Sequence, residues 1–431
     1  MPIFLTLLLV AMIASGLMIA VAAGLASILG GWAIFGDPFG ELVPKMVARF
    51  AIDRIDNFLL LAIPFFILAG RLMNSGGVTV RLFDFVAAIS QPLRGGLGHA
   101  NVMASFVFAG MSGSATADVV GLGAIEMKAM RSNGYPEDFS AGVTAASSLL
   151  GPCLPPSIVL IAYSVQAEQS VATMFLAAIV PGILLALCFM GWVAYQSRRR
   201  GLPRGSWPAP GDFGRKAGRA ILPMLTPGII LAGIYGGIFT PTEAAAVAVL
   251  YALILTMVIY REIGISDLVR ELKGTVLDSA TLLFIIAMTS AFGAIMLRLG
   301  LPQTLATLVT NLSENGTVVM FLLLVLWLVV GCFMAQTPAI IILTPILLPI
   351  ADRLGLDLVH FGIVMAMSLT LGLMTPPIGM VLYALQKVAH VRIGILFRVA
   401  IPYVAIMLVF LTVLILLPVL TTGLPYAFGY R

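Results

Sequence analysis

The chain has 431 residues, of which 60% are hydrophobic and only 10% are charged, whereas soluble domains have about 45–50% and 25%. Its 24 basic and 19 acidic residues leave long charge-free stretches between them. No polar surface is then large enough to keep so much apolar area in water, which excludes a soluble enzyme and indicates an integral membrane protein. The net charge of +5 does not point to nucleic acid, because the basic residues lie in short loops between apolar segments.

Apolar stretches long enough to cross a bilayer core of about 30 Å recur along the whole chain, and they predict an all-α membrane protein. The first begins without a charged region or a cleavage site, so we expect a retained span. The stretches that we expect to cross completely are nine: 3–28, 57–75, 137–166, 170–197, 220–238, 243–261, 279–298, 357–388 and 393–418.

Two further apolar segments are interrupted in the middle by polar, turn-forming residues. Residues 95–132 contain Ser112-Gly113-Ser114-Ala115-Thr116, and residues 317–353 contain Ala335-Gln336-Thr337-Pro338. Each segment is long enough for two spans, yet the polar centre favours a re-entrant helix–turn–helix hairpin. We therefore expect two hairpins in addition to the nine spans.

Three segments mix charged and apolar residues at helical spacing: 38–55, 78–93 and 264–276. Such segments lie along the membrane interface, so we expect them to form arms beside the spans. Arg71 and Arg298 come at the ends of corresponding spans, where long basic side chains reach out of the apolar region to the interface. We expect both to behave in that way.

The distribution of basic residues predicts an orientation. With a cytoplasmic N-terminus, the predicted spans put 18 of the 24 basic residues inside and leave the C-terminus outside, as the positive-inside rule requires. A Pro-, Gly- and Arg-rich loop at about 197–219 divides the chain nearly in half. The basic residues left outside are Lys45, Arg49, Arg54, Arg298, Arg353 and Arg431.

The second half of the chain repeats features of the first at one offset of 221 residues. Because the first hairpin would enter from the cytoplasm and the second from outside, the two repeats are expected to be inverted. That is the architecture of secondary transporters, whose binding site lies between the repeats near the bilayer midplane. The residues that coincide are Thr116 with Thr337, Gly134 with Gly355, Gly151 with Gly372, and Pro155-Pro156 with Pro376-Pro377.

Both halves carry a span that a double proline interrupts. Proline lacks the N–H and clashes with the preceding turn, so the helix unwinds and frees backbone carbonyls. Carbonyl and hydroxyl oxygens suit a hard cation. We therefore expect one Na⁺ site per repeat, each made by a hairpin tip and the neighbouring break. The alternative interpretation is that the prolines only kink packed helices. The expected ligands are Ser112, Gly113, Ser114, Thr116, Gly151 and Pro155 in the first site, and Gln336, Thr337, Gly372, Thr375 and Pro376 in the second.

The same breaks expose N-termini of half-helices, which attract an anion such as a substrate carboxylate. Asp118 follows the first tip. As an ionisable group in a membrane hairpin it either tunes a cation site, couples protons or caps a half-helix. Glu243 belongs to Thr240-Pro241-Thr242-Glu243, which predicts a capping box at the start of a span. Candidate substrate contacts are Ser114, Asp118, Pro156, Ser157, Thr337 and Pro377.

Several of these motifs together identify a family. The first tip reads Ala109-Gly110-Met111-Ser112-Gly113-Ser114-Ala115-Thr116-Ala117-Asp118, followed by Met127-Lys128 and Gly134-Tyr135. With Pro155-Pro156-Ser157, Phe239-Thr240-Pro241-Thr242-Glu243-Ala244 and Thr375-Pro376-Pro377-Ile378-Gly379, the chain closely resembles the large membrane subunit of tripartite ATP-independent periplasmic (TRAP) transporters. The likeness extends over essentially the whole chain.

The resemblance implies a Na⁺-driven importer in a bacterial or archaeal inner membrane, with Na⁺ as the co-transported ion and no organic cofactor. Its expected partners are a small four-helix membrane subunit, an extracytoplasmic binding protein and an organic acid; this chain would not be the fused form. The implied fold is that of the ion-transporter superfamily, in which a transport domain moves as an elevator against a scaffold. The expected division is 1–56 scaffold span and arm, 57–166 first transport half, 167–278 scaffold spans, 279–390 second transport half and 391–431 a C-terminal span.

Three other functions compete with this interpretation. The nearest is a stand-alone Na⁺/dicarboxylate carrier of the same superfamily. A passive channel fits less well, because paired breaks in an inverted repeat suit alternating access. A membrane-embedded enzyme would need a Ser–His pair, paired aspartates or HExxH within the spans, and we expect no enzyme because the sequence contains none of these.

Overall fold

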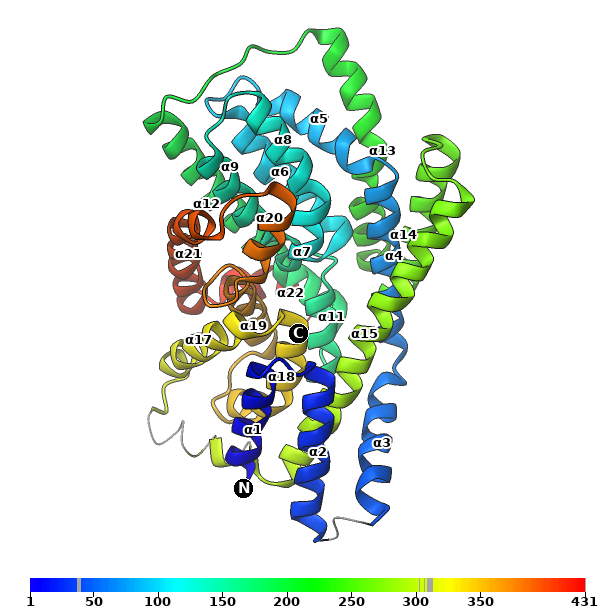
Figure 1. Cartoon of the computed structure of the whole chain (residues 1–431), viewed down its shortest axis with the longest axis vertical. Coiled ribbons are helices and arrows are strands. Elements are labelled where there is room, and N and C mark those ends of the chain that lie inside the picture. The colour runs from blue at the N-terminus through cyan, green and yellow to red at the C-terminus, as the bar shows by residue number, and fades with distance from the viewer. Residues whose placement is uncertain (37–39, 302, 306, 308–312, 431) are drawn as a thin grey trace.

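The computed structural model describes residues 1–36, 40–301, 303–305, 307 and 313–430, and no strand occurs among them (Figure 1). The all-helical fold class is thereby confirmed. Eight helices or helical segments of this described part are long and apolar enough to cross a membrane: Phe58–Ser75, Glu137–Ala167, Val171–Arg199, Pro210–Tyr235, Pro241–Ile259, Ile265–Arg298, Gly316–Phe333 and Ile393–Leu416.

The N-terminal segment differs from the single span expected over residues 3–28. It consists of α1 (Pro2–Ala14) and α2 (Ile19–Phe35), which pack against each other. The chain reverses between them at Gly16, whose φ of +92° lies in the left-handed region that interrupts a helix. In Figure 1, α1 runs upward from the N-terminus and α2 runs back down, so the N-terminus and the last turn of α2 lie at the same end of the molecule.

The predicted arms are helical, although one is not a separate element. α3 (Leu42–Ile55) and α5 (Val78–Ser90) flank the span formed by η1 (Phe58–Leu61) and α4 (Ala62–Ser75). Residues 264–276, by contrast, are the first part of the continuous helix α15 (Ile265–Arg298).

Arg71 does not reach out alone to the interface as expected. Its guanidinium lies 3.1 Å from Glu271 Oε2 and 2.7 Å from Asp278 Oδ2, and Ser75 Oγ donates to Glu271 Oε1 over 2.8 Å. It therefore ties α4 to the first turns of α15. The guanidinium of Arg298 packs over the Phe50 ring on α3, 5.0 Å from its centre. Each arginine therefore contacts one of the predicted arm segments.

The first hairpin has the predicted form. α6 (Gly96–Ser112) ends at Gly113, and the chain returns through α7 (Ala115–Asp118), the π-helical turn η2 (Val119–Gly123) and α8 (Ala124–Ser132). Gly113 has a φ of +58°, a conformation that glycine adopts at little cost. The polar tip predicted around residue 113 is thus the point of reversal.

The double-proline spans are interrupted where the sequence predicts. The first consists of α9 (Glu137–Ser148), α10 (Leu150–Cys153) and α11 (Ile158–Ala167), and residues 154–157 between the last two are not helical. The second consists of α19 (Leu358–Gly372) and α20 (Met380–Ala389), with a break at 373–379. Both double prolines are joined by a cis peptide bond.

The remaining spans surround these elements. α12 (Val171–Arg199) and α13 (Pro210–Tyr235) extend into the predicted loop 197–219, which leaves only 200–209 between the helices. α14 (Pro241–Leu253) starts at the predicted capping box, where Glu243 Oε2 accepts from Thr240 N over 2.8 Å. The other elements are η3 (Ile254–Ile259), the second hairpin α17 (Gly316–Phe333) and α18 (Gln336–Arg353), α21 (Ile393–Leu416) and α22 (Val419–Ala427).

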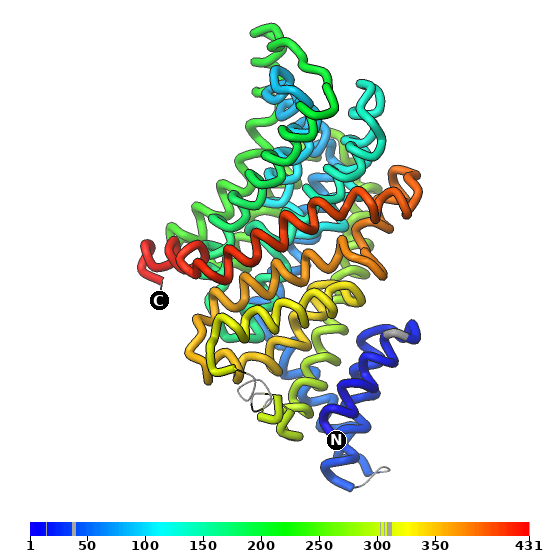
Figure 2. The backbone as a smooth tube through the Cα atoms, turned by 90° about the vertical axis from the view of Figure 1, so that its left-hand side faces the viewer, coloured from blue at the N-terminus to red at the C-terminus, as the bar shows by residue number. Residues whose placement is uncertain are grey.

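Elements from both halves of the chain interleave in one body. Figure 2 shows α17, α19 and α21 running side by side, and α11, which follows the first break, packs against α18 of the second hairpin. α20, which follows the second break, packs against η2 and α7 of the first hairpin. Each break is therefore followed by a helix that contacts the opposite hairpin.

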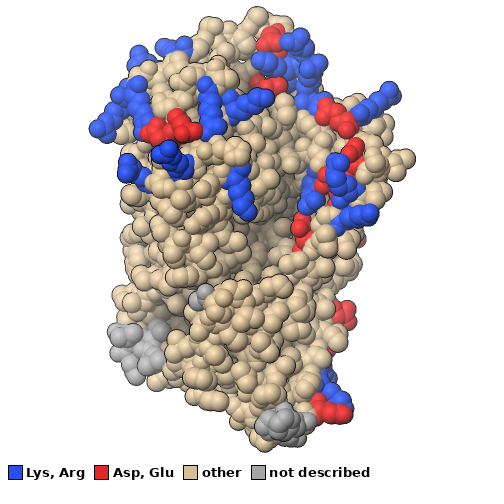
Figure 3. All heavy atoms as spheres, in the orientation of Figure 1, with Lys and Arg blue, Asp and Glu red and all other residues tan. Residues whose placement is uncertain are grey.

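Basic side chains gather at the upper end of the molecule as drawn, and on this face a broad band below them carries almost no charge (Figure 3). The place of the N-terminus in the fold bears on its expected orientation. Because α1 and α2 form a helical hairpin, the N-terminus lies on the same side as α3 with Lys45, Arg49 and Arg54. If those three residues are extracytoplasmic, the N-terminus is extracytoplasmic as well.

Candidate functional site

The tip of the first hairpin lies against the first break. A Cβ atom added to Gly113 would lie 2.7 Å from the carbonyl oxygen of Pro156, and one added to Gly151 would lie 3.0 Å from the carbonyl carbon of Ser114. Real Cβ atoms do not come as close to backbone as 2.7 Å, so position 113 requires glycine, and at position 151 a side chain would push the tip backbone away. The structure therefore brings Gly113 and Ser114 together with Gly151 and Pro156.

Three hydroxyl groups lie at or next to this contact. Ser114 Oγ lies 3.2 Å from Thr116 Oγ1, and the same Oγ accepts from the N–H of Ala117 as the cap of α7. Ser112 is 8% exposed, and its hydroxyl has no hydrogen-bond partner among the described residues. A buried hydroxyl without a partner costs free energy unless something binds it, and it lies next to the tip.

Ser157 has a structural role that the sequence did not reveal. Its Oγ donates to the carbonyl of Pro152 over 2.7 Å and accepts from the N–H of Leu160, so it bridges the break and caps α11. Its hydroxyl hydrogen is therefore already used within the chain. Pro155 and Pro156 are buried in the same break.

The second tip contacts the second interrupted span less directly. Gln336 begins α18, and its Oε1 lies 2.8 Å from Thr370 Oγ1 on α19. One helical turn before the tip, a Cβ added to Gly372 would lie 2.3 Å from the carbonyl carbon of Gly331. α17 and α19 thus pack backbone to backbone just before the tip and the break.

The two predicted sites differ in burial. Gln336 and Thr337 are buried, whereas Pro376, Pro377 and Ile378 of the second break are exposed. Thr375 Oγ1 donates to the carbonyl of Leu371 or Gly372, which are 3.0 and 3.1 Å away. The first break is closed by its tip, while the second leaves its prolines on the surface.

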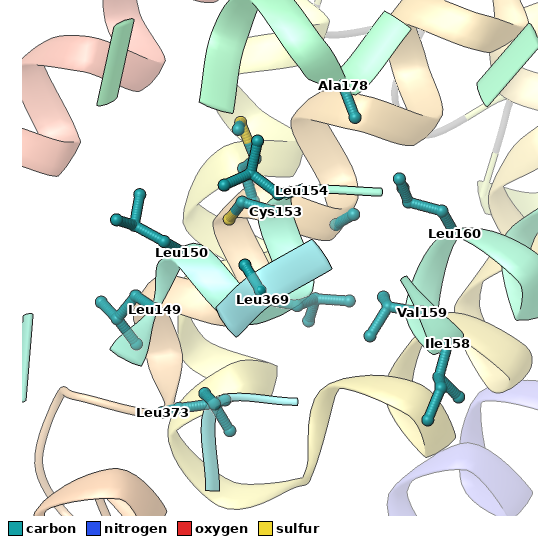
Figure 4. Packing of buried hydrophobic residues seen from close by; sticks show 14 of the residues in the cluster. Leu149, Leu150, Cys153, Leu154, Ile158, Val159, Leu160, Ala178, Leu369 and Leu373 are labelled. Carbon is teal, nitrogen blue, oxygen red and sulfur yellow. The ribbon is translucent and has the colours of Figure 1, made fainter. Parts of the chain in front are cut away.

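The two interrupted spans meet in the apolar interior. Figure 4 shows Leu150 and Cys153 of α10 close to Leu369 of α19, with Leu373 nearby. All four are buried in one cluster, and α10 contacts α19. The helical segments that precede the two breaks are consequently packed against each other in one core.

Sequence reasoning missed a buried polar network between α6 of the first hairpin and α9 of the first interrupted span. Asn101 Nδ2 donates to Thr144 Oγ1 over 2.7 Å, Ser147 Oγ donates to Asn101 Oδ1 over 2.6 Å, and Ser105 Oγ donates to Ser147 Oγ over 3.1 Å. The signal was present as Asn101 and Ser105 one turn apart on α6, facing Thr144 and Ser147 on α9. Asp118 is buried beside Ser105 rather than exposed at the tip.

Comparison with known proteins gives the family. A model described as "Tripartite ATP-independent periplasmic transporter, DctM component" matches residues 5–420. The chain is 40% identical to the sialic acid TRAP transporter large permease protein SiaM of Vibrio cholerae, over 90% of this chain and 91% of that protein. It is 37% identical to the C4-dicarboxylate TRAP transporter large permease protein DctM of Pseudomonas aeruginosa, over 90% and 91%.

The fold has a solved counterpart. The YdaH transporter of Alcanivorax borkumensis, whose crystal structure revealed an unusual topology, superimposes with a TM-score of 0.62 at 16% identity, over 91% of this chain and 90% of that one. At that identity the likeness concerns the fold alone. The family match covers nearly the whole chain, and with it the hairpins and breaks described above. The chain therefore belongs to the DctM family, the large membrane subunits of tripartite ATP-independent periplasmic transporters.

Proposed function

We propose that this chain drives the import of an organic acid with Na⁺, as the large membrane subunit of a TRAP transporter in the inner membrane. It works with a small membrane subunit and with an extracytoplasmic binding protein that delivers the substrate. The two hairpins and the two interrupted spans form the moving part, which carries substrate and Na⁺ across as an elevator.

The contact between the first tip and the first break is the observation that carries the proposal. It joins the carbonyl of Pro156, the hydroxyl pair of Ser114 and Thr116, and the unpartnered hydroxyl of Ser112. Neutral oxygen ligands of this kind suit a hard monovalent cation. Irregular backbone at membrane depth is stable only where protein or a bound ion satisfies its carbonyls.

The second predicted Na⁺ site brings together fewer carbonyl and hydroxyl oxygens than the first. Gln336 and Thr337 supply an amide and a hydroxyl at the start of α18, and Thr375 lies in the second break with its prolines exposed. A second Na⁺ at this tip follows from the matched sequence positions, and movement of the second tip toward Thr375 would complete it.

The substrate class rests on the relatives. The proteins named above are a sialic acid permease and a C4-dicarboxylate permease, and both substrates carry a carboxylate. N–H groups at the starts of α7 and α11 and the co-bound cations would hold such an anion. Each net positive charge that enters with it gains about 2.3 kcal/mol per 100 mV, so two Na⁺ suffice to drive a monoanion inward.

We further propose that the basic end faces the cytoplasm, in line with the positive-inside rule. The C-terminus then lies outside, as expected from the sequence. The N-terminus also lies outside, because α1 and α2 reverse the chain before α3.

Reconstitution tests the proposed function. Proteoliposomes that contain this chain and the small subunit encoded with it should accumulate the acid only when Na⁺ and the loaded binding protein are outside. Uptake that needs neither the binding protein nor the small subunit would identify a stand-alone carrier instead. Flux that follows the substrate gradient regardless of Na⁺ would identify a channel.

A further inference from the structure

A hollow of about 380 Å³ lies on the surface beside the last two turns of α12, and we call it the α12 hollow. Two aromatic rings, one amide and two guanidinium groups form its walls, and no acidic side chain of the described residues lines it. The two rings pack against each other with their centres 5.3 Å apart. The lining residues are Trp192, Tyr195, Gln196, Arg199 and Arg200.

The α12 hollow lies where α12 leaves the apolar part of a membrane. With its 29 residues, α12 is about 43 Å long, whereas the apolar core of a bilayer is about 30 Å thick. α12 ends toward the part of the molecule where basic side chains gather (Figures 1 and 3). Tyr195 is 51% exposed, and exposed aromatic side chains gather at the level of the lipid headgroups. A ligand in the hollow would therefore lie at headgroup depth.

An exposed apolar strip leads from the α12 hollow toward the middle of α12. Ile183 and Leu187 are 40% and 57% exposed, and Gly191 is exposed with no atom within 4 Å of an added Cβ. These residues come four positions apart, so they follow one side of the helix up to Tyr195. A lipid acyl chain can lie along this strip while its headgroup occupies the hollow.

The two arginines of the hollow differ in their partners. Arg200 Nη1 lies 2.8 Å from Asp138 Oδ2, and the Arg200 guanidinium lies 5.9 Å from the centre of the Phe139 ring, so Arg200 is held in place. Arg199 forms no ion pair with any residue that the structure describes. A guanidinium presents its N–H donors in a planar fork that fits two phosphate oxygens. Arg199 thus offers an anion a positive group without a counter-charge.

Two polar atoms in the walls of the hollow also lack partners. Trp192 Nε1 and Gln196 Oε1 are buried, and neither forms a hydrogen bond within the described part of the chain. A buried donor or acceptor without a partner costs free energy. A headgroup phosphate beside the ring supplies an acceptor for the indole N–H, and a headgroup hydroxyl supplies a donor for the amide oxygen.

From this geometry we propose that the α12 hollow binds the headgroup of an anionic phospholipid. The phosphate accepts from the guanidinium of Arg199, and the rings of Trp192 and Tyr195 pack against the glycerol part of the lipid. One acyl chain follows the exposed strip toward Ile183. A free anion would meet the same guanidinium groups, but it would use neither the rings nor the strip, so the lipid is the better fit.

Quenching of tryptophan fluorescence by brominated lipids tests the site. The chain has four tryptophans, so in the full-length chain with Trp32, Trp207 and Trp327 replaced by phenylalanine only Trp192 reports. Vesicles would contain equal parts of phosphatidylglycerol and phosphatidylcholine, with bromine on the acyl chains of one lipid or of the other. Because the hollow favours an anionic headgroup, the quenching should indicate a several-fold preference for phosphatidylglycerol beside Trp192.

Arg198→Gln is the matched control for Arg199→Gln. Both arginines are exposed on the last turn of α12 and neither has an ion-pair partner among the described residues, but only Arg199 lines the hollow. Arg199→Gln should abolish the preference for phosphatidylglycerol, and Arg198→Gln should keep it. Arginines that only orient the chain in the membrane would make the two substitutions equivalent.

Three results would overturn the proposal. Equal quenching by the two lipids in the parent chain would mean that no headgroup is selected at Trp192. An equal loss of preference in Arg198→Gln and Arg199→Gln would mean that surface charge in general attracts the lipid. Loss of the preference in excess inorganic phosphate, compared with sodium chloride of the same ionic strength, would mean that the hollow binds a free anion.

If the chain with a single tryptophan does not fold, native mass spectrometry replaces the quenching experiment. The wild-type chain, Arg198→Gln and Arg199→Gln would each be purified with phosphatidylglycerol, and the lipid molecules retained by each would be counted. Loss of a bound lipid in Arg199→Gln alone supports the site, whereas the same number in all three, or an equal loss in both variants, refutes it. Both measurements are independent of the proposed function, because they need neither substrate nor Na⁺.

Discussion

At the scale of single residues, the candidate site depends as much on absent side chains as on present ones. Gly113 and Gly151 let the first tip touch the first break, and Gly331 and Gly372 let α17 touch α19 through their backbones. A methyl group would overlap a backbone atom at Gly113, Gly331 or Gly372 and would press tightly on one at Gly151. These glycines therefore set the distance between each hairpin and its interrupted span.

Replacement of Gly372 by alanine should separate α17 from α19. The new methyl would lie 2.3 Å from the carbonyl carbon of Gly331, and backbone cannot move aside as a flexible side chain can. We expect destabilisation of about 1–3 kcal/mol and loss of uptake, measured by thermal unfolding in detergent and by reconstitution. Gly228→Ala in α13, where no atom lies within 4 Å of the added Cβ, is the matched control. Equal stability of the two variants would contradict the close contact.

The hydroxyls at the tips should set the dependence on Na⁺. Thr116→Ala removes the hydroxyl 3.2 Å from Ser114 Oγ, and Thr337→Ala removes the one beside Gln336. We expect each variant to need several-fold more Na⁺ for half-maximal uptake, with the folded yield preserved. Thr412→Ala in α21, whose hydroxyl bonds only its own helix at Leu408, should behave as wild type. Unchanged Na⁺ activation in both tip variants would exclude these hydroxyls as ligands.

At the scale of elements, strong local signals made the central features predictable. Pro155-Pro156 and Pro376-Pro377 cannot continue a helix, and a polar tip such as Ser112-Gly113-Ser114 cannot cross the apolar core unpaired, so breaks and hairpins follow from residue chemistry alone. The reversal between α1 and α2 was missed because Gly16 sits in an unbroken apolar run, where hydropathy does not distinguish one span from two short helices. The polar network around Asn101 was missed because its members lie on two helices whose contact only tertiary structure defines.

The ion pairs between α4 and α15 should contribute more to the free energy of unfolding than an ordinary surface ion pair does. Glu271 is largely buried and is neutralised by Arg71, which also reaches Asp278. Arg71→Ala would leave that carboxylate buried without its main partner, and we expect a loss of about 1–3 kcal/mol because the site is partly open to solvent. Urea or thermal unfolding of the purified chain measures it.

Arg270→Ala provides the comparison for this link. Arg270 also approaches Glu271, at 3.6 Å, but its side chain is 65% exposed. We expect a change within about 0.5 kcal/mol. If Arg71→Ala lowered the free energy of unfolding no more than Arg270→Ala does, the ion pairs of Arg71 would not stabilise the packing of α4 against α15.

At the scale of the whole molecule, the reversal between α1 and α2 would change the side from which the chain enters the membrane and would leave the later elements as they are. All later elements keep the alternation that puts the basic residues at one end, and only the N-terminus moves to the side of α3. The positive-inside rule is insensitive to this change, because residues 1–44 contain no lysine or arginine. Orientation of the N-terminus therefore depends on the structure and not on the charge count.

Single cysteines can decide this orientation. In a chain with Cys153, Cys188 and Cys332 replaced by alanine, we would introduce Pro2→Cys, Glu41→Cys or Ser206→Cys and expose intact spheroplasts to a membrane-impermeant maleimide. Because α1 and α2 are antiparallel, Pro2→Cys and Glu41→Cys should both react from outside. Ser206→Cys, in the exposed segment between α12 and α13, should react only after lysis. Labelling of Pro2→Cys together with Ser206→Cys, and not with Glu41→Cys, would instead require one continuous first span and restore a cytoplasmic N-terminus.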